Sequence, residues 1–129
     1  MEIEELLQSL DENHLGWSIT MAPLIMANAD RAELGEELTN SFCSTDPTIA
    51  KQFARVTFLT NSRAILSQCK TLSLILQCSD DLIAPVEVGQ YMHEQLENSV
   101  LVILEATGHC PHLSAPEETT AAILDFLNN

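Results

Sequence analysis

Basic residues are scarce in this sequence, and their scarcity excludes several kinds of partner. Five Lys and Arg stand against nineteen Asp and Glu among 129 residues, which gives a formal net charge of −14 with His neutral. A surface of this sign repels the phosphate backbone of nucleic acids and the anionic face of a membrane. We therefore predict no nucleic-acid partner and no membrane partner, and we interpret the acidic surface as a solubility feature.

Long apolar runs and paired cysteines are missing as well. No apolar run approaches the length that spans a bilayer, and three of the first five residues are glutamate where a signal or transit peptide would be basic. The four cysteines form no C-x-x-C pair and lack the regular spacing of a disulfide framework, so reduced thiols are the simplest interpretation. These absences predict a soluble, cytoplasmic chain.

The length and the apolar content limit what the chain can be. At 129 residues it has the size of one ordinary domain, too short for a complete enzyme with a separate cofactor domain, and we predict no cofactor. The apolar residues make up 46% of the chain, which excludes wholesale disorder in spite of the charge. One compact core is the most that we expect.

The first half of the chain has the apolar spacing of helices almost throughout. Residues 3–10 repeat at i, i+3, i+4 and i+7, and the spacing over 17–25 predicts a second helix that Pro23 should kink or divide. Residues 1–68 are therefore predicted to form four or five helices with short joints.

Two capping signals mark further helix starts in this half. Asp30 with Glu33 three residues on is an acidic variant of the capping box and predicts a third helix. Asp46 followed by Pro47 has the N-cap and first-position proline that open a fourth helix. The apolar stripe of that fourth helix consists of Ile49, Phe53 and Val56.

The second half changes period. Residues 72–78 and 100–104 are apolar runs of strand length, Pro85 opens a helical pattern between them, and Ser114 with a glutamate three residues on predicts a final helix. This order is a βαβα unit with two parallel strands. Because both strands are apolar on both faces and two strands are fewer than a stable sheet normally needs, we expect them to pair with further strands.

Polar loops follow both strands, over 77–85 and 106–112, at the edge where open α/β sheets place functional groups. The first loop contains Asp80 and Asp81, and the second contains His109. An acid after one strand and a histidine after the next form the second part of a nucleophile, histidine and acid relay, whose chain order in one large fold is Ser, Asp, His.

The two loop sequences carry a resemblance to a known family. The runs S-L-I-L-Q-C-S-D-D-L-I-A-P and G-H-C-P-H-L-S-A-P-E-E-T resemble the acid and histidine motifs of the α/β-hydrolase fold. They are especially similar to the RsbQ-type stress-signalling hydrolases, relatives of the plant strigolactone and karrikin receptors. The similarity continues through the helical half in F-C-S-T-D-P and I-A-K-Q-F-A, and so covers nearly the whole chain.

The resemblance implies an α/β fold class, namely a C-terminal fragment of the α/β-hydrolase fold. Residues 1–68 would be the helical lid, and residues 69–129 the last two strands with their helices. Asp81 would be the catalytic acid, because it stands four residues before Pro85 as in the family pattern D-x-x-x-P, and His109 would be the catalytic base. The family also implies a small hydrophobic ester or lactone as substrate, and a signalling phosphatase with a sensory domain as partner.

The chain departs from the family pattern in one large respect. Its glycines are Gly16, Gly35, Gly89 and Gly108, so it contains no G-x-S-x-G nucleophile elbow. The nearest run places Ser18 inside a helical pattern, and we do not assign it as nucleophile. We therefore expect either a partial hydrolase, inactive alone and complemented by a partner chain that supplies the N-terminal half, or a non-catalytic module that self-associates as a homo-oligomer and serves in interaction or ligand binding.

Simpler interpretations of the same residues stand beside these. Asp81 is also suited to capping the following helix, and His109 to bonding a backbone carbonyl. His109 and His112 with Cys110 have some likeness to a zinc site, but Pro111 breaks the helix that this spacing needs, so we predict no metal.

The remaining candidates also have ordinary explanations. Cys78 or Cys110 beside the histidine is a possible nucleophile, although a thiol at a strand end usually acts as a small hydrophobe. His14 and His112 are interpreted as polar residues of the surface or of a pocket edge. The large apolar residues of the helical half are interpreted as core rather than as pocket lining: Trp17, Met21, Phe42, Phe53 and Phe58.

Overall fold

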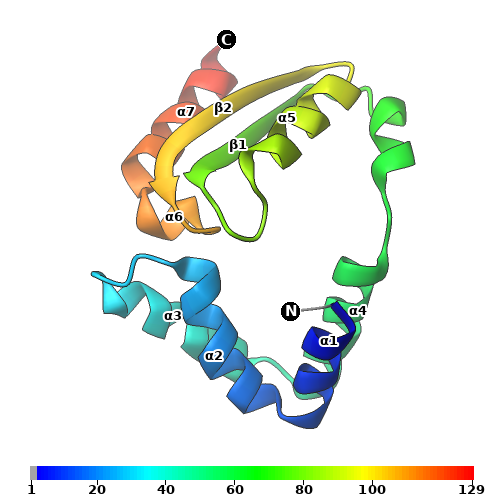
Figure 1. Cartoon of the computed structure of the whole chain (residues 1–129). Helices are drawn as coiled ribbons and strands as arrows, with labels where there is room; N and C mark the ends of the chain where they lie inside the picture. Colours follow the sequence, from blue (N-terminus) through cyan, green and yellow to red (C-terminus); the bar gives the residue numbers. More distant parts are fainter. Residues whose placement is uncertain (1–2) are drawn as a thin grey trace. The chain divides into compact units, whose positions relative to one another are not determined.

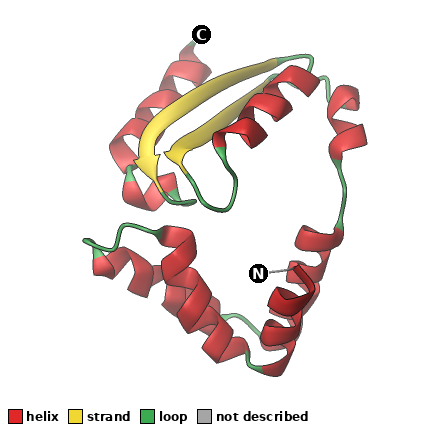
Figure 2. Cartoon of the chain, in the orientation of Figure 1, coloured by secondary structure: helices red, strands yellow, loops and turns green. Residues whose placement is uncertain are grey.

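The computed structural model describes residues 3–129 and shows helices followed by a small parallel sheet (Figures 1 and 2). The elements are α1 (Ile3–Glu12), α2 (His14–Met26), α3 (Ala32–Ser44), α4 (Pro47–Leu59), the 3₁₀ helix η1 (Arg63–Gln68), β1 (Ser73–Asp80), α5 (Val86–Gln95), β2 (Ser99–Thr107), α6 (Pro111–Ser114) and α7 (Pro116–Asn128). Among the described residues, every helix is too short or too polar to cross a membrane. The predicted helical half and βαβα half are confirmed.

The chain folds into two compact units. The first unit comprises the residues up to Leu24 together with Ala29–Asn61, and the second comprises Ile25–Asn28 together with Ser62–Asn129. The short segment 25–28 therefore packs with the sheet, although both of its neighbours in sequence belong to the helical unit. The assignment of residues 1–68 as a lid remains a prediction.

Within the first unit, α1 packs against α4 around a small apolar core. Leu7, Leu10 and Ala54 form that core, and Trp17 of α2 packs against it. The predicted start of α4 is confirmed, because the carboxylate of Asp46 accepts the backbone N–H groups of the second and third helical residues. Such a cap satisfies donors that would otherwise have no partner in the helix.

Two local predictions in this unit were wrong, and one of the two alternatives predicted for Pro23 is excluded. Helix α3 begins after Arg31 with no side-chain capping bond, so Asp30 and Glu33 form no capping box. Pro23 was predicted to kink or divide α2, and the structure excludes the division, because the helix continues through Pro23 to Met26. The apolar stripe of α4 is not buried within this chain, since Phe53, for example, is 71% exposed.

The second unit is built on β1 and β2, which pair in parallel as predicted. Helices α5 and α7 flank the two strands (Figure 1). The predicted capping box of the last helix was wrong. Helix α7 starts after Ala115 without a side-chain cap, and Ser114 instead ends α6, where its hydroxyl donates to the carbonyl of Cys110.

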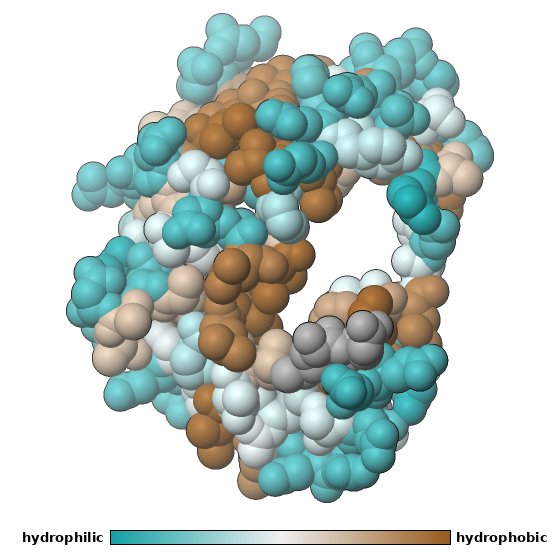
Figure 3. All heavy atoms as spheres, in the orientation of Figure 1, coloured by the Kyte–Doolittle hydropathy of each residue, from teal (hydrophilic) through white to brown (hydrophobic). Residues whose placement is uncertain are grey.

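The strand pair leaves apolar surface uncovered. Within residues 3–129 the sheet has only these two strands, so each has one edge without a neighbour. Val100 and Ile103 of β2 are exposed, and brown apolar surface lies over the strands in Figure 3. This agrees with the expectation from sequence that the pair is suited to a larger sheet.

Candidate active site

The carboxyl ends of the two strands bring the predicted acid and histidine together. Asp80 at the end of β1 pairs with Thr107 at the end of β2, and the N–H of Gly108 donates to the carbonyl oxygen of Asp80 at 2.8 Å. Asp81 directly follows Asp80 in the first loop, and His109 directly follows Gly108 in the second. The two predicted site residues therefore leave the sheet side by side.

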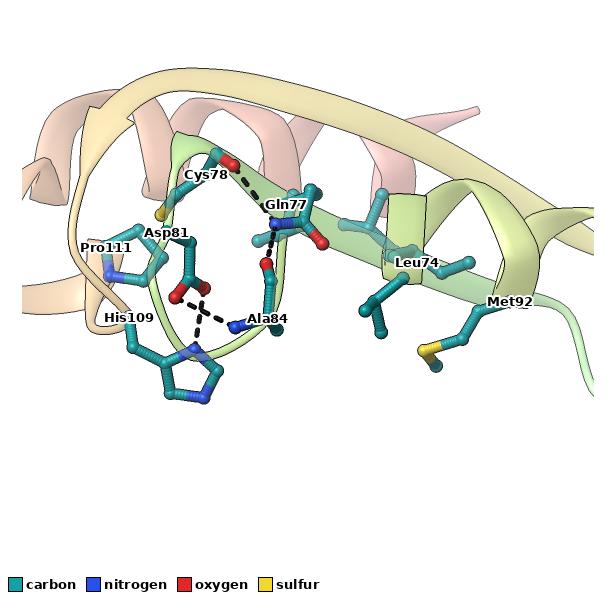
Figure 4. Close-up of a pocket in the computed structure, with 11 residues that line it drawn as sticks. Leu74, Gln77, Cys78, Asp81, Ala84, Met92, His109 and Pro111 are labelled. Carbon is teal, nitrogen blue, oxygen red and sulfur yellow. Dashed lines mark hydrogen bonds and ion pairs between the residues drawn. The ribbon is translucent and has the colours of Figure 1, made fainter. Parts of the chain in front are cut away.

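Asp81 is held by three hydrogen bonds. Its Oδ1 accepts the backbone N–H groups of Ile83 at 2.8 Å and of Ala84 at 3.1 Å. Its Oδ2 lies 2.7 Å from Nδ1 of His109 (Figure 4). The side chain is only 5% exposed. The loop therefore fixes one carboxylate oxygen and leaves the other directed at the imidazole.

The imidazole of His109 is bonded on one side and open on the other. With Asp81 accepting at Nδ1, the neutral ring carries its proton on Nδ1 and leaves Nε2 as an acceptor. Figure 4 shows the far ring nitrogen turned away from Asp81, and the side chain is 44% exposed. A histidine in this arrangement can take a proton at Nε2 while the carboxylate stabilises the resulting imidazolium.

The backbone that carries His109 is also fixed. Gly108 has a φ of +89°, and a Cβ at this position would lie 2.0 Å from the carbonyl oxygen of Met26. The N–H of His109 donates to the carbonyl oxygen of Ile25 at 2.9 Å. Only glycine fits this backbone conformation and this close approach. Met26 and Ile25 could not be recognised from sequence as supports of the site, because no local pattern pairs them with residues about eighty positions away.

The structure also places the residues that were alternative candidates for the acid, the nucleophile and the histidine. Asp80 is exposed and contacts the second loop only through its backbone carbonyl, so Asp81 is the acid that meets the histidine. Ser18 lies fully buried inside α2 and donates to the carbonyl of His14, as its helical setting predicted. His112 is exposed on α6.

The two cysteines beside the site are poor nucleophiles. Burial raises the pKa of Cys78, and the neighbouring Asp81 carboxylate and Cys110 raise it further. Burial and Asp81 likewise raise the pKa of Cys110. Because the thiolate is the reactive form, these shifts disfavour a cysteine nucleophile at this place.

A metal centre finds no support in the described part of the chain. Between residues 3 and 129, no three His, Cys, Asp or Glu side chains are grouped as they would be around a metal ion. Pro111, expected to break the helix between the two histidines, instead opens the four-residue helix α6 at its first position, where proline is favoured.

A cavity of about 310 Å³ adjoins the pair. It is lined by five consecutive β1 residues, 74–78, and by α5 residues that include Val88 and Met92, with Asp81 and His109 at its rim (Figure 4). Neighbouring residues of a strand point to opposite faces, so a cavity lined by five in a row runs along an edge of the strand rather than over one face. This edge is the one that β2 does not occupy.

Comparisons with known proteins agree with the geometry. No family model matches the chain. It is 30% identical over 129 residues to karrikin insensitive 2 receptor IA of Petunia hybrida, covering 99% of this chain and 47% of that protein. It is 31% identical over 116 residues to a strigolactone esterase of Pisum sativum, covering 89% of this chain and 43% of that protein.

A solved structure extends the similarity to three dimensions. A hydrolase from Oleispira antarctica superposes with a TM-score of 0.94 at 42% identity, over 98% of this chain and 46% of that one. The chain thus spans about half the length of the proteins it matches, and the match lies in their C-terminal half. Sequence and structure together identify it as a counterpart of the C-terminal half of the α/β-hydrolase fold, related to karrikin receptors and strigolactone esterases.

Proposed function

We propose that the chain supplies the acid and the histidine of a serine-type α/β hydrolase, with Asp81 and His109 in these roles. The observation that carries the proposal is the 2.7 Å contact between Asp81 Oδ2 and His109 Nδ1, made by a carboxylate whose other oxygen is already bonded to two backbone N–H groups. Such bonding orients the imidazole in one tautomer before any substrate binds.

The proposed chemistry follows from that tautomer. Nε2 of His109 accepts the proton of a serine hydroxyl as the serine oxygen attacks an ester or lactone carbonyl. Asp81 stays ionised and stabilises the imidazolium, which then gives the proton to the leaving alcohol oxygen. Water repeats the sequence in the second half-reaction, and its proton passes through His109 to the serine oxygen when the acyl group is released.

The serine is proposed to come from a segment outside these 129 residues, which contain no G-x-S-x-G. The cavity along the free edge of β1 suits an added strand, because unpaired backbone groups of a strand edge bind another strand. A strand docked there would lie beside the end of β1, where Asp81 and His109 stand. Open parallel sheets gather their functional loops at this end.

The finer features of the proposal rest on the relatives, on the sequence resemblance and on the cysteines. The relative named as an esterase supports an ester as substrate. A small hydrophobic ester or lactone, and a role in stress signalling with a sensory phosphatase partner, are proposed from the RsbQ-type resemblance of the sequence. The four cysteines are all free, which supports a reducing, cytoplasmic setting. Each of these features is a proposal about the whole protein.

A chimera tests the catalytic roles. The N-terminal half of the Oleispira hydrolase, which this chain does not match, is joined to residues 1–129, and hydrolysis of a p-nitrophenyl ester is measured. We expect His109→Ala and Asp81→Asn each to lower kcat by on the order of 10³- to 10⁴-fold. His112→Ala is the matched control, because this exposed histidine lies only three residues away and should leave kcat unchanged.

Two results would contradict the catalytic proposal. One is a His109→Ala chimera that keeps its esterase activity. The other is a folded parent chimera whose serine is not labelled by a fluorophosphonate probe, since labelling requires a serine that a histidine activates.

A second function is favoured by the exposed apolar surface of the strands. Val100 and Ile103 and the free edge of β1 also suit pairing with another copy of this chain, which would give a non-catalytic homo-oligomer. Light scattering of the native particle with intact masses of its chains separates the two functions. A second, different polypeptide supports the hydrolase, and copies of the 14.2 kDa chain alone support the module.

A further inference from the structure

Helix α2 ends in an unusual backbone conformation next to the histidine loop. Ala27 and Asn28 have φ values of 53° and 54°, so two successive residues other than glycine adopt the left-handed region. Asparagine tolerates this region because its side chain can bond locally, whereas alanine has no such compensation. A conformation of this kind persists only where surrounding contacts hold it.

The contacts that hold it come from the loop that carries His109. The last carbonyl groups of a helix lack partners within the helix. Here the carbonyl of Ile25 accepts the N–H of His109, and Gly108 packs directly against the carbonyl of Met26. The histidine loop therefore caps the C-terminal end of α2, and the segment 25–28 belongs to the same compact unit as that loop.

The side-chain amide of Asn28 joins the two segments. Its Nδ2 donates to the carbonyl of Met26 at 2.9 Å and to the carbonyl of Thr107 at 2.8 Å, across 79 positions of sequence. Both acceptors are carbonyl oxygens, so only the NH₂ end of the amide can make these bonds. Thr107 is the last residue of β2, two positions before His109.

We propose that Asn28 is a positioning residue for His109. Its amide clamps the end of β2 to the end of α2 and thereby holds the backbone from which the imidazole reaches Asp81. This inference rests on the proposed function, because positioning has a catalytic meaning only if His109 is the base. Without the clamp, the ends of α2 and β2 separate, and the imidazole loses its fixed place over the Asp81 carboxylate.

The first test reads the imidazole itself. Ring ¹⁵N chemical shifts of His109 are measured on the 129-residue chain, with the signal assigned by its loss in His109→Ala. The parent should show the widely separated ring signals of a single Nδ1–H tautomer. In Asn28→Ala and Asn28→Gly the two signals should move toward each other, because the ring then samples both tautomers. The glycine variant adopts a φ of 54° without strain, so it keeps the test valid where alanine impairs folding.

The matched control removes an equivalent bond elsewhere in the same unit. Nδ2 of Asn98 donates to the carbonyl of Lys70 at 3.0 Å, at the opposite ends of the strands from His109. Asn98→Ala should leave the His109 ring signals as they are in the parent. Equal shifts in both variants, or parent-like signals in the folded Asn28 variants, overturn the proposal.

The second test measures turnover in the chimera. Asn28→Gly should lower kcat by roughly tenfold to a hundredfold with little change in KM, since misplaced catalytic groups slow the chemical step more than they weaken binding. An unchanged kcat with shifted ring signals would contradict the catalytic meaning of the clamp. A His109→Ala chimera that stays active would instead refute the proposed function, while the ring shifts still report whether Asn28 orients the imidazole.

Discussion

Gly108→Ala is the substitution that tests most directly how the histidine loop packs against segment 25–28. The new Cβ would lie 2.0 Å from the carbonyl oxygen and 2.8 Å from the carbonyl carbon of Met26. These are backbone atoms, which cannot rotate away as the end of a side chain can. Either segment 25–28 must withdraw from the loop, or the loop must withdraw from the sheet.

The expected loss of stability has two parts. A residue with a Cβ at a φ of +89° costs about 1–2 kcal/mol more than glycine. Withdrawal of segment 25–28 also breaks the bond from the His109 N–H to the Ile25 carbonyl and that from Asn28 to the Thr107 carbonyl. Each bond contributes about 0.5–1.5 kcal/mol. Together these terms predict a loss of about 2–5 kcal/mol.

The assay is equilibrium unfolding in urea, with the change in midpoint converted to a free energy at constant slope. Gly35→Ala is the control, because a Cβ there meets nothing closer than Pro23 Cα at 3.7 Å and the residue lies inside α3. It should be neutral or stabilise its unit by up to about 1 kcal/mol. A Gly108→Ala variant whose free energy of unfolding lies within about 0.5 kcal/mol of that of the parent would refute the close packing of the histidine loop against segment 25–28.

Two further predictions concern a helix cap and the buried thiols. Asp46→Ala should lower the free energy of unfolding by about 1 kcal/mol in urea titrations, whereas Ser62→Ala, at an N-cap without a side-chain bond, should not. Burial and Asp81 raise the pKa values of Cys78 and Cys110 in the folded state, so the unfolded chain releases these protons first as the pH rises. The contribution of these two thiols to the free energy of unfolding should therefore be fully present below about pH 8.5 and be lost above it. Replacing both thiols by alanine should flatten that fall in urea titrations under reductant, and an identical slope would contradict it.

Apolar periodicity was a sound guide to the elements, because it reflects which face of each element is apolar whether or not a partner covers it. Helices α1, α2 and α4 and both strands lie where the spacing placed them. The same pattern does not tell what covers a face. The stripe of α4 that includes Ile49 and Phe53 is regular in sequence and exposed in this chain.

Capping signals were less reliable than periodicity, for a physical reason. Asp46 directly precedes Pro47, and its carboxylate accepts two N–H groups of the first turn of α4. Asp30 lies in the turn at 29–30 that follows the left-handed residues Ala27 and Asn28, and α3 begins only after Arg31. The hydroxyl of Ser114 donates to the carbonyls of Thr107 at the end of β2 and of Cys110 at the start of α6, and it does not cap α7. A capping motif indicates a helix start only where the side chain is not engaged elsewhere.

The acid and the histidine could be located from sequence because strand ends are visible as the limits of apolar runs. The support for the histidine could not, because the amide of Asn28 and the carbonyl of Thr107 are 79 positions apart. One local signal was present. An asparagine just after a helical pattern is a common left-handed C-terminal residue, and here it would have pointed to a special end for α2.

The side-by-side exit of Asp81 and His109 depends on an irregularity in the sheet. From Ser73 to Cys78 each β1 residue pairs with β2 at a constant offset, but Asp80 pairs with Thr107, one residue later than that offset predicts. The extra residue in β2 is a bulge, and a shift of one residue turns every following side chain to the other face of a strand. Without it the histidine would leave β2 one position out of phase with Asp81. The length of β2 relative to β1, and not only the presence of the two residues, therefore determines whether they meet.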